Sequence, residues 1–343
     1  MKTLKEIYQA NEELNYIDSS LYSRYRVKAG LRNDNGTGVK VGLTKICDVI
    51  GYKFVHEKKY NIDGQLIYRG YPINYLVDKQ PKDRIFGFEE VAFLLIFGTL
   101  PTEEQLQEFK DYLLNFKMGP VDLQYETPNI LNALQIEVLK LYAKDPSADT
   151  DDLEERMMKG LNILASIPLF TFSYARNKVF KSYPYPDKSL AENILCMARG
   201  NDQYTLEEAR ILDTLLMVHA DHGGGNNSTF ANVVISSTGT DIYSCISAAI
   251  GSLKGPKHGG ANCKVTNMFK AIFHEVGFTT DKLTLKKIAN RLLDKDFFDH
   301  SGLIYGIGHA IYTKSDPRAL LIQQQCEMLA KSKGQEDIYN CIH

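Results

Sequence analysis

The most constraining feature of this sequence is the recurrence of apolar residues at helical spacing along most of its length. A capping box formed by Thr102 and Gln105 opens one such segment, and Thr205 with Glu208 opens another. Both are followed by apolar residues three or four positions apart, which is the pattern of a helix that buries one face. Similar stripes mark three further segments: Ile242–Leu253, Val265–Phe273 and Leu321–Met328. The chain is therefore predicted to be mainly α-helical.

Glycine, proline and capping residues set the expected ends of these helices. Gly255-Pro256 ends the third, Asp316-Pro317 opens the fifth, and Gly334 closes it. After Gly334, residues 335–343 begin another helical pattern that stops within a few turns. Because so short a helix is unstable alone, we expect the chain to lack a C-terminal part.

Strand signal is confined to Tyr52–Gly70, where Asn61-Ile62-Asp63-Gly64 has the composition of a hairpin turn. The predicted fold is therefore mainly α with one small N-terminal β-hairpin. At 343 residues the chain exceeds one ordinary domain, so two domains are expected.

Charge and cysteine usage exclude several classes of function. Lys and Arg number 40 against 42 Asp and Glu, so no basic excess favours nucleic acid or an anionic membrane as a partner. The 6 cysteines include no C-x-x-C pair, which is typical of reduced thiols in the cytoplasm. The N-terminus has no apolar signal-peptide core, and no stretch reaches the roughly 20 apolar residues of a membrane span. A soluble cytoplasmic protein is expected.

Three glycine-rich junctions each contain a histidine, and the first holds His219 and His222. Both are expected on the apolar face and at the end of the helix that Thr205 opens, just before Gly223-Gly224-Gly225. Three glycines let a backbone approach a small ligand closely. The alternative is a helix C-terminus with buried, hydrogen-bonded histidines. A metal site is disfavoured, because H-x-x-H has the wrong spacing for one helix face and no cysteine pair accompanies it.

The second junction places His258 between Gly255 and Gly260, directly before a predicted helix. Free N–H groups and the positive end of the helix dipole disfavour a protonated imidazole there. A neutral histidine can donate a hydrogen bond to a developing enolate oxygen. The alternative is a polar loop residue that packs against the helix entrance.

The third junction is Gly306-Ile307-Gly308-His309, followed by Arg318 in the first turn of the next helix. The glycines are weak as a dinucleotide-binding fingerprint, because residue 311 is Ile and no strand clearly precedes them. A guanidinium beside free backbone amides suits a carboxylate, and a surface arginine is the alternative. Together, the three junctions indicate acid–base chemistry at carbonyl groups of a substrate that carries carboxylates.

Four ordered segments carry a resemblance to a known family. They are Tyr68–Ile73, Ala220–Phe230, Gly251–Asn262, and Gly306–Ala310 with Asp316-Pro317-Arg318. The last three resemble the signature segments of citrate synthases, and the first is similar to the hairpin and following turn of that family. The similarity extends through nearly the whole chain.

This resemblance implies a mainly α homodimer whose subunits each have a large helical domain and a smaller mobile helical domain. In this chain they would be residues 1–258, without a C-terminal return segment, and residues 259–343. The implied reaction condenses acetyl-CoA with oxaloacetate to citrate and free CoA, the first step of the tricarboxylic acid cycle. Those two substrates are the expected partners, and neither a metal nor a permanently bound cofactor is implied.

The resemblance also assigns roles to individual residues. By the family pattern, His258 polarises the thioester carbonyl as the enol forms, and His309 donates to the ketone of oxaloacetate. His222, Asn226 and Arg318 match substrate-binding positions. The backbone of a four-residue segment resembles part of the CoA contact: Tyr305, Gly306, Ile307 and Gly308.

One catalytic group of the family is not matched. The family removes the methyl proton with an aspartate well downstream of the second histidine, and general-base catalysis is typically worth about 10²–10⁴-fold. The acidic residues after His309 do not match that motif: Asp316, Glu327, Glu336 and Asp337. Two alternatives therefore stay open, a 2-methylcitrate synthase that uses propionyl-CoA and a non-catalytic relative that binds CoA, oxaloacetate or a partner subunit.

Overall fold

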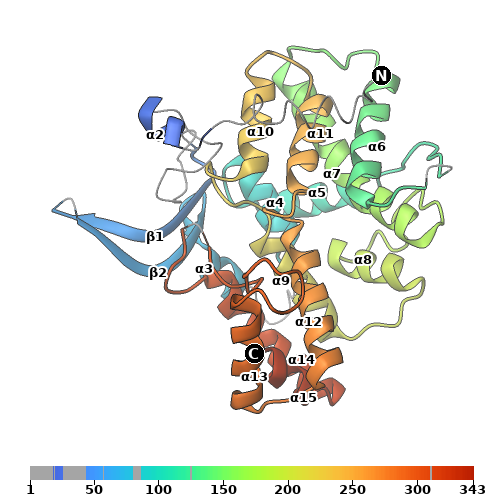
Figure 1. Ribbon diagram of the computed structural model, residues 1–343. Helices are drawn as coiled ribbons and strands as arrows, with labels where there is room; N and C mark the ends of the chain where they lie inside the picture. The colour runs from blue at the N-terminus through green and yellow to red at the C-terminus, as the bar shows by residue number, and fades with distance from the viewer. Residues whose placement is uncertain are drawn as a thin grey trace, which may run out of the picture.

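The computed structural model describes residues 18, 20–25, 44–56, 58–79, 86–123, 126–309 and 311–343, and over these ranges it is mainly α-helical. One small antiparallel sheet, formed within residues 47–72, lies beside a body of helices (Figure 1). The predicted fold class is confirmed. No helix within the described ranges is long and apolar enough to cross a membrane.

The helices follow one another along the chain, and a long connection over residues 294–316, between α13 and α14, contains His309. The first are α2 (Ser20–Tyr25), α3 (Ile73–Asp78), α4 (Phe88–Phe97), α5 (Glu103–Leu114), α6 (Ile130–Lys144), α7 (Leu153–Arg176) and α8 (Leu190–Arg199). The remainder are α9 (Leu206–Val218), α10 (Asn227–Ser236), α11 (Ile242–Leu253), α12 (Ala261–Val276), α13 (Lys282–Leu293), α14 (Pro317–Lys333) and α15 (Glu336–Ile342).

The predicted helix boundaries are confirmed at the capping residues. Thr102 caps α5 in a capping box with Gln105, and Thr205 caps α9 in the same way with Glu208. Asp316 caps α14, and Gly334 ends it in the left-handed conformation, with φ 62°. Local side-chain chemistry therefore sets these ends, which is why sequence alone could locate them.

The hairpin turn lies elsewhere than predicted. The three strands pair in the order β1 (Cys47–Val55), β2 (Lys58–Tyr68), β3 (Tyr71–Pro72). The chain reverses at His56, which has φ 47°, so the prediction of a turn at residues 61–64 is wrong. Those residues lie inside β2 at an irregularity where Ile50 pairs with Gln65 but Tyr52 pairs with Asn61. Such a bulge bends the strand and leaves the extra residues outside the hydrogen-bonded pairing of β1 with β2.

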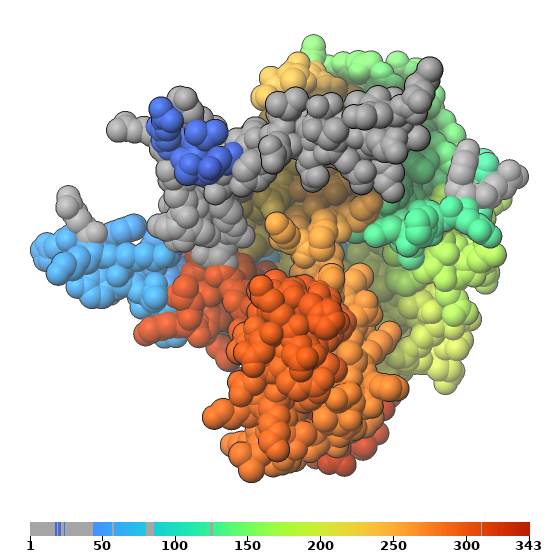
Figure 2. Space-filling model, in the orientation of Figure 1, coloured from blue at the N-terminus to red at the C-terminus, as the bar shows by residue number. Residues whose placement is uncertain are grey.

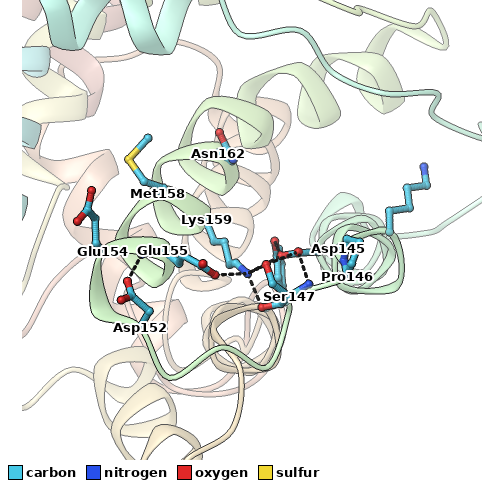
Figure 3. Close-up of a pocket in the computed structure, with 11 residues that line it drawn as sticks. Asp145, Pro146, Ser147, Asp152, Glu154, Glu155, Met158, Lys159 and Asn162 are labelled. Atoms are coloured by element: carbon cyan, nitrogen blue, oxygen red, sulfur yellow. Dashed lines mark hydrogen bonds and ion pairs between the residues drawn. The ribbon is translucent and has the colours of Figure 1, made fainter.

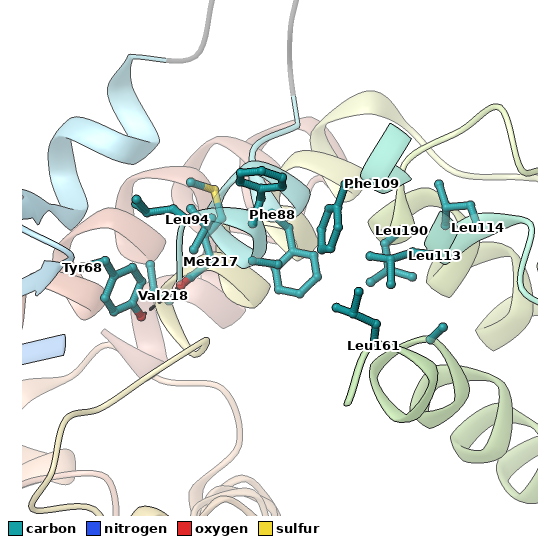
Figure 4. Close-up of a cluster of buried hydrophobic side chains, with 14 of the residues drawn as sticks. Tyr68, Phe88, Leu94, Phe109, Leu113, Leu114, Leu161, Leu190, Met217 and Val218 are labelled. Atoms are coloured by element: carbon teal, nitrogen blue, oxygen red, sulfur yellow. Dashed lines mark hydrogen bonds between the residues drawn. The ribbon is translucent and has the colours of Figure 1, made fainter. Parts of the chain in front are cut away.

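The main core forms around α4, which is buried along most of its length (Figure 4). A helix that is apolar all round belongs in the centre of a protein. Its neighbours α5, α7, α8 and α9 and the end of β2 contribute further side chains, among them Tyr68, Phe109, Leu113, Leu161, Leu190 and Met217.

Two buried carboxylates connect α4 to its neighbours. Asp213 of α9 accepts hydrogen bonds from the N–H groups of Gly87 and Phe88, at 2.8 and 3.1 Å, and so caps a helix whose own N-cap is glycine. Glu89 of α4 accepts from the N–H of Leu190 at the start of α8, at 2.8 Å. Burial, together with the charge of Glu89, raises the pKa of Asp213 to about 7. The two carboxylates fix the orientation of three helices.

A separate apolar cluster joins α12 and α13: Met268, Ile272, Ile288 and Leu292. By contrast, α14 packs against α9, β2 and α3, and α15 packs against α14. These four C-terminal helices group at the end of the molecule away from α10 and α11 (Figure 1). The β1–β2 hairpin projects from the side of the body in the space-filling view (Figure 2). The domain division at residues 258/259 stays a prediction.

Candidate active site

The first histidine junction meets the third in the folded chain. The Nε2 atoms of His222 and His309 lie 2.9 Å apart, although the residues are 87 positions apart in the sequence. The prediction that His222 lies on the face of α9 is wrong, because that helix ends at Val218 and His219 is its C-cap. The His219 side chain is exposed and bonds back to the carbonyl of Leu215. His222 alone therefore belongs to the site.

The hydrogen bonds define the tautomers of this pair. His309 Nδ1 accepts from the backbone N–H groups of Ile311 and Tyr312, at 3.1 and 3.0 Å. Its proton must then be on Nε2, which donates to His222 Nε2. The proton of His222 is consequently on Nδ1, a buried atom that has no hydrogen-bond partner among the described residues. Burial, together with the nearby Arg318 cation, lowers the pKa of His222 to about 3, so this imidazole is neutral near pH 7.

His258 lies at the end of the connection between α11 and α12, three residues before the first residue of α12. Its Nε2 is 3.0 Å from the hydroxyl oxygen of Ser228, in the first turn of α10. Burial lowers the pKa of His258. The neutral state that the sequence predicted from the helix dipole thus has a different cause in the structure, the loss of water around the imidazole.

Asn226 takes part in a local structural contact. Its Oδ1 accepts from the N–H groups of Ser228 and Thr229, at 2.8 and 3.2 Å, and caps α10. The cap also fixes the backbone of Ser228 beside His258. The predicted contact of Asn226 with substrate stays a prediction.

Arg318 is paired with a carboxylate of its own chain. Its Nε and one terminal nitrogen donate to the two oxygens of Asp316, at 3.0 and 2.6 Å. Although burial disfavours the charged carboxylate, the hydrogen bonds and charge of Arg318 hold the pKa of Asp316 below its ordinary value. The guanidinium side chain is 18% exposed. A bidentate pair of this kind orients the guanidinium rigidly.

The segment predicted to contact CoA is an exposed turn that hydrogen bonds connect to α12. Gly306 and Gly308 have φ values of 91° and 96°, which favour glycine, and Ile307 is 77% exposed. The hydroxyl of Tyr305 donates to Asp299 at 2.6 Å, and the same carboxylate accepts from Lys264 of α12 at 2.9 Å. The turn is thereby fixed to the helix that follows His258.

A charged surface pocket lies elsewhere, between the ends of α6, α7 and α11, with a volume of about 680 Å³ (Figure 3). Its central amine, Lys159, contacts Asp145 at 2.9 Å and the Ser147 hydroxyl at 2.9 Å. The described residues that line it include none of the predicted site residues. The chemistry read from the sequence is therefore concentrated at the histidines.

Sequence reasoning missed three residues of this site. Ser228 beside His258 and Tyr312 behind His309 carry no distinctive spacing, and Asp316 was read only as a helix cap. Asp316 could have been found, because an acidic residue two positions before an arginine in a first turn can reach it. The two others depend on tertiary contacts.

The sequence matches a family model described as "Citrate synthase, C-terminal domain" over residues 33–343. It is 36% identical over 285 residues to citrate synthase of Haloferax volcanii, which covers 79% of this chain and 70% of that protein. It is 32% identical over 287 residues to 2-methylcitrate synthase 1 of Corynebacterium glutamicum, covering 80% of this chain and 70% of that protein. The crystal structure of citrate synthase from Pyrobaculum aerophilum superimposes with a TM-score of 0.68 at 26% identity, covering 92% of this chain and 78% of that one.

Proposed function

Because this chain belongs to the citrate synthase family, we propose that it condenses acetyl-CoA with oxaloacetate, with consumption of one water, to give citrate and free CoA, and so serves the tricarboxylic acid cycle. The observation that carries the proposal is the contact of His222 with His309, beside an arginine that Asp316 orients. Burial and the charge of that arginine lower the pKa of His222. Such a set can polarise carbonyl groups while it binds carboxylates.

His258 polarises the thioester carbonyl in this proposal. When the Ser228 hydroxyl donates to Nε2, the remaining proton of the imidazole is on Nδ1. A neutral N–H donor stabilises the enolate oxygen that develops as the methyl group of acetyl-CoA gives its proton to a general base, a role to which we assign no residue. Since a donor already in place needs no reorganisation, the gain is realised in the transition state.

His309 and Arg318 handle oxaloacetate. The ketone oxygen takes the place of His222 as the acceptor of the His309 Nε2–H, which stabilises the alkoxide as the new carbon–carbon bond forms. The buried Nδ1–H of His222 supplies a further donor, and Arg318 supplies a positive charge for a carboxylate. We assign no general base after His309, because Asp316 is held by Arg318 and Glu327 by Lys331.

The exposed turn of Tyr305, Gly306, Ile307 and Gly308 is proposed to contact CoA. Its glycines leave backbone groups open to a ligand, and Ile307 offers an apolar surface to it. Asn226 is proposed to help bind substrate beside His258, with its amide nitrogen, since its oxygen caps α10.

The proposed activity predicts oxaloacetate-dependent release of thiol from acetyl-CoA by the purified chain. His258→Ala removes the donor to the enolate and should lower kcat by about 10²–10³-fold with little change in KM. Lys257→Ala, at the exposed neighbouring position, is the control and should leave kcat within about twofold. If oxaloacetate and CoA bind but no thiol is released, the chain is a binding relative without catalysis.

The relatives include a 2-methylcitrate synthase at 32% identity, so propionyl-CoA is the second candidate donor. One additional methyl group in an apolar pocket changes discrimination by only about 10–200-fold. The ratio of kcat/KM for acetyl-CoA and propionyl-CoA decides between the two donors.

A homodimer is proposed from the surface formed by α6, α10 and α11. The apolar helix α10 has no buried residue in the single chain, and Val233 and Val234 are 49% and 46% exposed. Ile136 and Leu139 of α6 are 42% and 45% exposed, and α11 packs against both helices. The cytoplasm is the proposed compartment, supported by 6 cysteines that are all free.

A further inference from the structure

One aromatic side chain lies against all three residues that we assign to oxaloacetate. The Tyr312 ring stacks on the His309 imidazole, with ring centres 4.8 Å apart and planes inclined by 23°. The His222 ring lies 6.0 Å from the Tyr312 ring, and the Arg318 guanidinium carbon lies 5.7 Å from its centre. A tilt of this one ring would therefore displace the donor, the second imidazole and the cation together.

Tyr312 is fixed at both ends. Its backbone N–H donates to His309 Nδ1 at 3.0 Å. Its hydroxyl donates to the carbonyl oxygen of Gln65 on β2, also at 3.0 Å. The side chain is buried, with the residue 5% exposed, so it has little freedom to change rotamer.

The sheet approaches this segment closely at two glycines. A Cβ atom at Gly51 would overlap the carbonyl oxygen of Ile311, and one at Gly64 would overlap that of Ser315. The N–H of Gly64 donates to the same Ser315 oxygen at 3.1 Å. The base of the hairpin therefore supports residues 311–315 along their length, and Tyr312 is the side chain that passes this support to the site.

We propose that Tyr312 is a positioning residue for the condensation step: anchored to β2, it holds the His309 ring with Nε2–H facing the ketone oxygen of oxaloacetate. The proposal rests on the proposed function, because it takes His309 as the donor to that ketone. Tyr312 acts through His309 and Arg318 and contacts no reacting atom. The hairpin is thus part of the machinery that orients the substrate donor.

Two substitutions separate the contributions of the hydroxyl and the ring. Tyr312→Phe keeps the stack and loses the bond to Gln65, and kcat/KM for oxaloacetate should fall about tenfold. Tyr312→Leu also loses the stack, and its kcat/KM for oxaloacetate should fall about 100-fold, since a small misplacement of a hydrogen-bond donor costs that much. The matched control is Tyr183→Phe, which removes another buried hydroxyl that donates to a backbone carbonyl, that of Ala165, at 2.8 Å. It should lower the denaturation midpoint and leave kcat/KM within about twofold.

A spectroscopic measurement tests the same idea without turnover. In protein labelled with ¹⁵N-histidine, the two ring nitrogens of His309 should report a single Nε2–H tautomer in the wild type, with the signals assigned through His309→Asn. Tyr312→Leu keeps the two backbone N–H donors but loses the stacked ring, so the His309 ring-nitrogen signals should shift and broaden as the imidazole takes more than one orientation. Tyr183→Phe should leave these signals unchanged.

The two readouts distinguish the possible failures. Absence of thiol release by the wild type would overturn the proposed function, whereas the ring-nitrogen signals of His309 would still report on Tyr312. The positioning role is overturned if Tyr312→Leu keeps both the wild-type ring-nitrogen signals and kcat/KM within about twofold. If that variant does not fold, Tyr312→Phe decides, and a loss of kcat/KM no greater than that of Tyr183→Phe overturns the role.

Discussion

The tautomer of His309 is set by the backbone. Two N–H groups, from Ile311 and Tyr312, occupy its Nδ1. Protonating this ring at Nδ1 would cost both bonds, so the histidine is restricted to donating from Nε2. In the structure that donor is bound to His222. Under the proposed function, a ketone oxygen would replace His222 as its acceptor, which exchanges one neutral hydrogen bond for another at a small net cost.

The sequence singled out His222, His258 and His309 as candidate site residues because each stands in a glycine-rich junction. It could not predict which of them are in contact. The contact between His222 and His309 spans 87 residues and so depends on tertiary packing. The sequence also could not identify the partner of Arg318, because Asp316 both caps α14 and pairs with the Arg318 guanidinium.

Neutral, buried His222 predicts a specific pH dependence of stability. Its pKa is lowered from 6.5 to about 3 in the folded chain, so between these values the unfolded chain binds a proton that the folded chain does not. Stability is then complete above pH 6.5 and falls as the pH decreases. Between about pH 7.5 and about pH 5, this linkage removes about 2 kcal/mol from the free energy of unfolding.

Urea denaturation of wild type and His222→Gln at both pH values measures this term. The variant should lose about 2 kcal/mol less than wild type on acidification. His274→Gln, at an exposed position on α12, is the control and should lose as much stability on acidification as the wild type. An equal loss in wild type and His222→Gln would show that His222 is already protonated, or water-exposed, in the folded chain.

At the scale of elements, the β1–β2 hairpin shows a tertiary contact outweighing a local turn signal. Residues 61–64 have turn composition, but the strand continues through them because Gly64 has a tertiary partner. Its N–H donates to Ser315, and its missing side chain makes room for that backbone. The turn composition treats Gly64 as a residue chosen for its backbone conformation, whereas in the structure its missing side chain lets two backbone segments approach closely. The helices had no such competitor, and their capping boxes were sufficient.

Gly64→Ala should therefore destabilise the protein by about 1–3 kcal/mol, because the new Cβ overlaps a backbone oxygen that cannot rotate away. The free energy of unfolding from chemical denaturation is the measurement. Gly119→Ala introduces the same group where nothing lies within 4 Å and should change stability by less than about 0.5 kcal/mol. Equal effects of the two substitutions would mean that the segment around Ser315 does not pack on the sheet.

At the scale of the whole molecule, the single chain has two kinds of apolar surface. The core around α4 is closed, and its buried carboxylates are satisfied by helix N-termini. The surface of α6, α10 and α11 is open, because Val233 and Val234 of α10 are 49% and 46% exposed although the helix packs on α11. Water therefore contacts apolar side chains that a partner could cover. The same surface on a second copy would cover it, and a two-fold axis would make the contact self-complementary.

This interface predicts that Val234→Asp converts the dimer to a monomer. In a dimer the new carboxylate would be buried without a partner, which is strongly unfavourable, whereas in the monomer it lies on a half-exposed helix. Sedimentation equilibrium should give about twice the chain mass of 38.8 kDa for the wild type and about that mass for the variant. Leu283→Asp is the matched control, because this α13 residue is 71% exposed and far from the surface in question (Figure 1). It should stay dimeric, and a monomeric wild type would overturn the interface altogether.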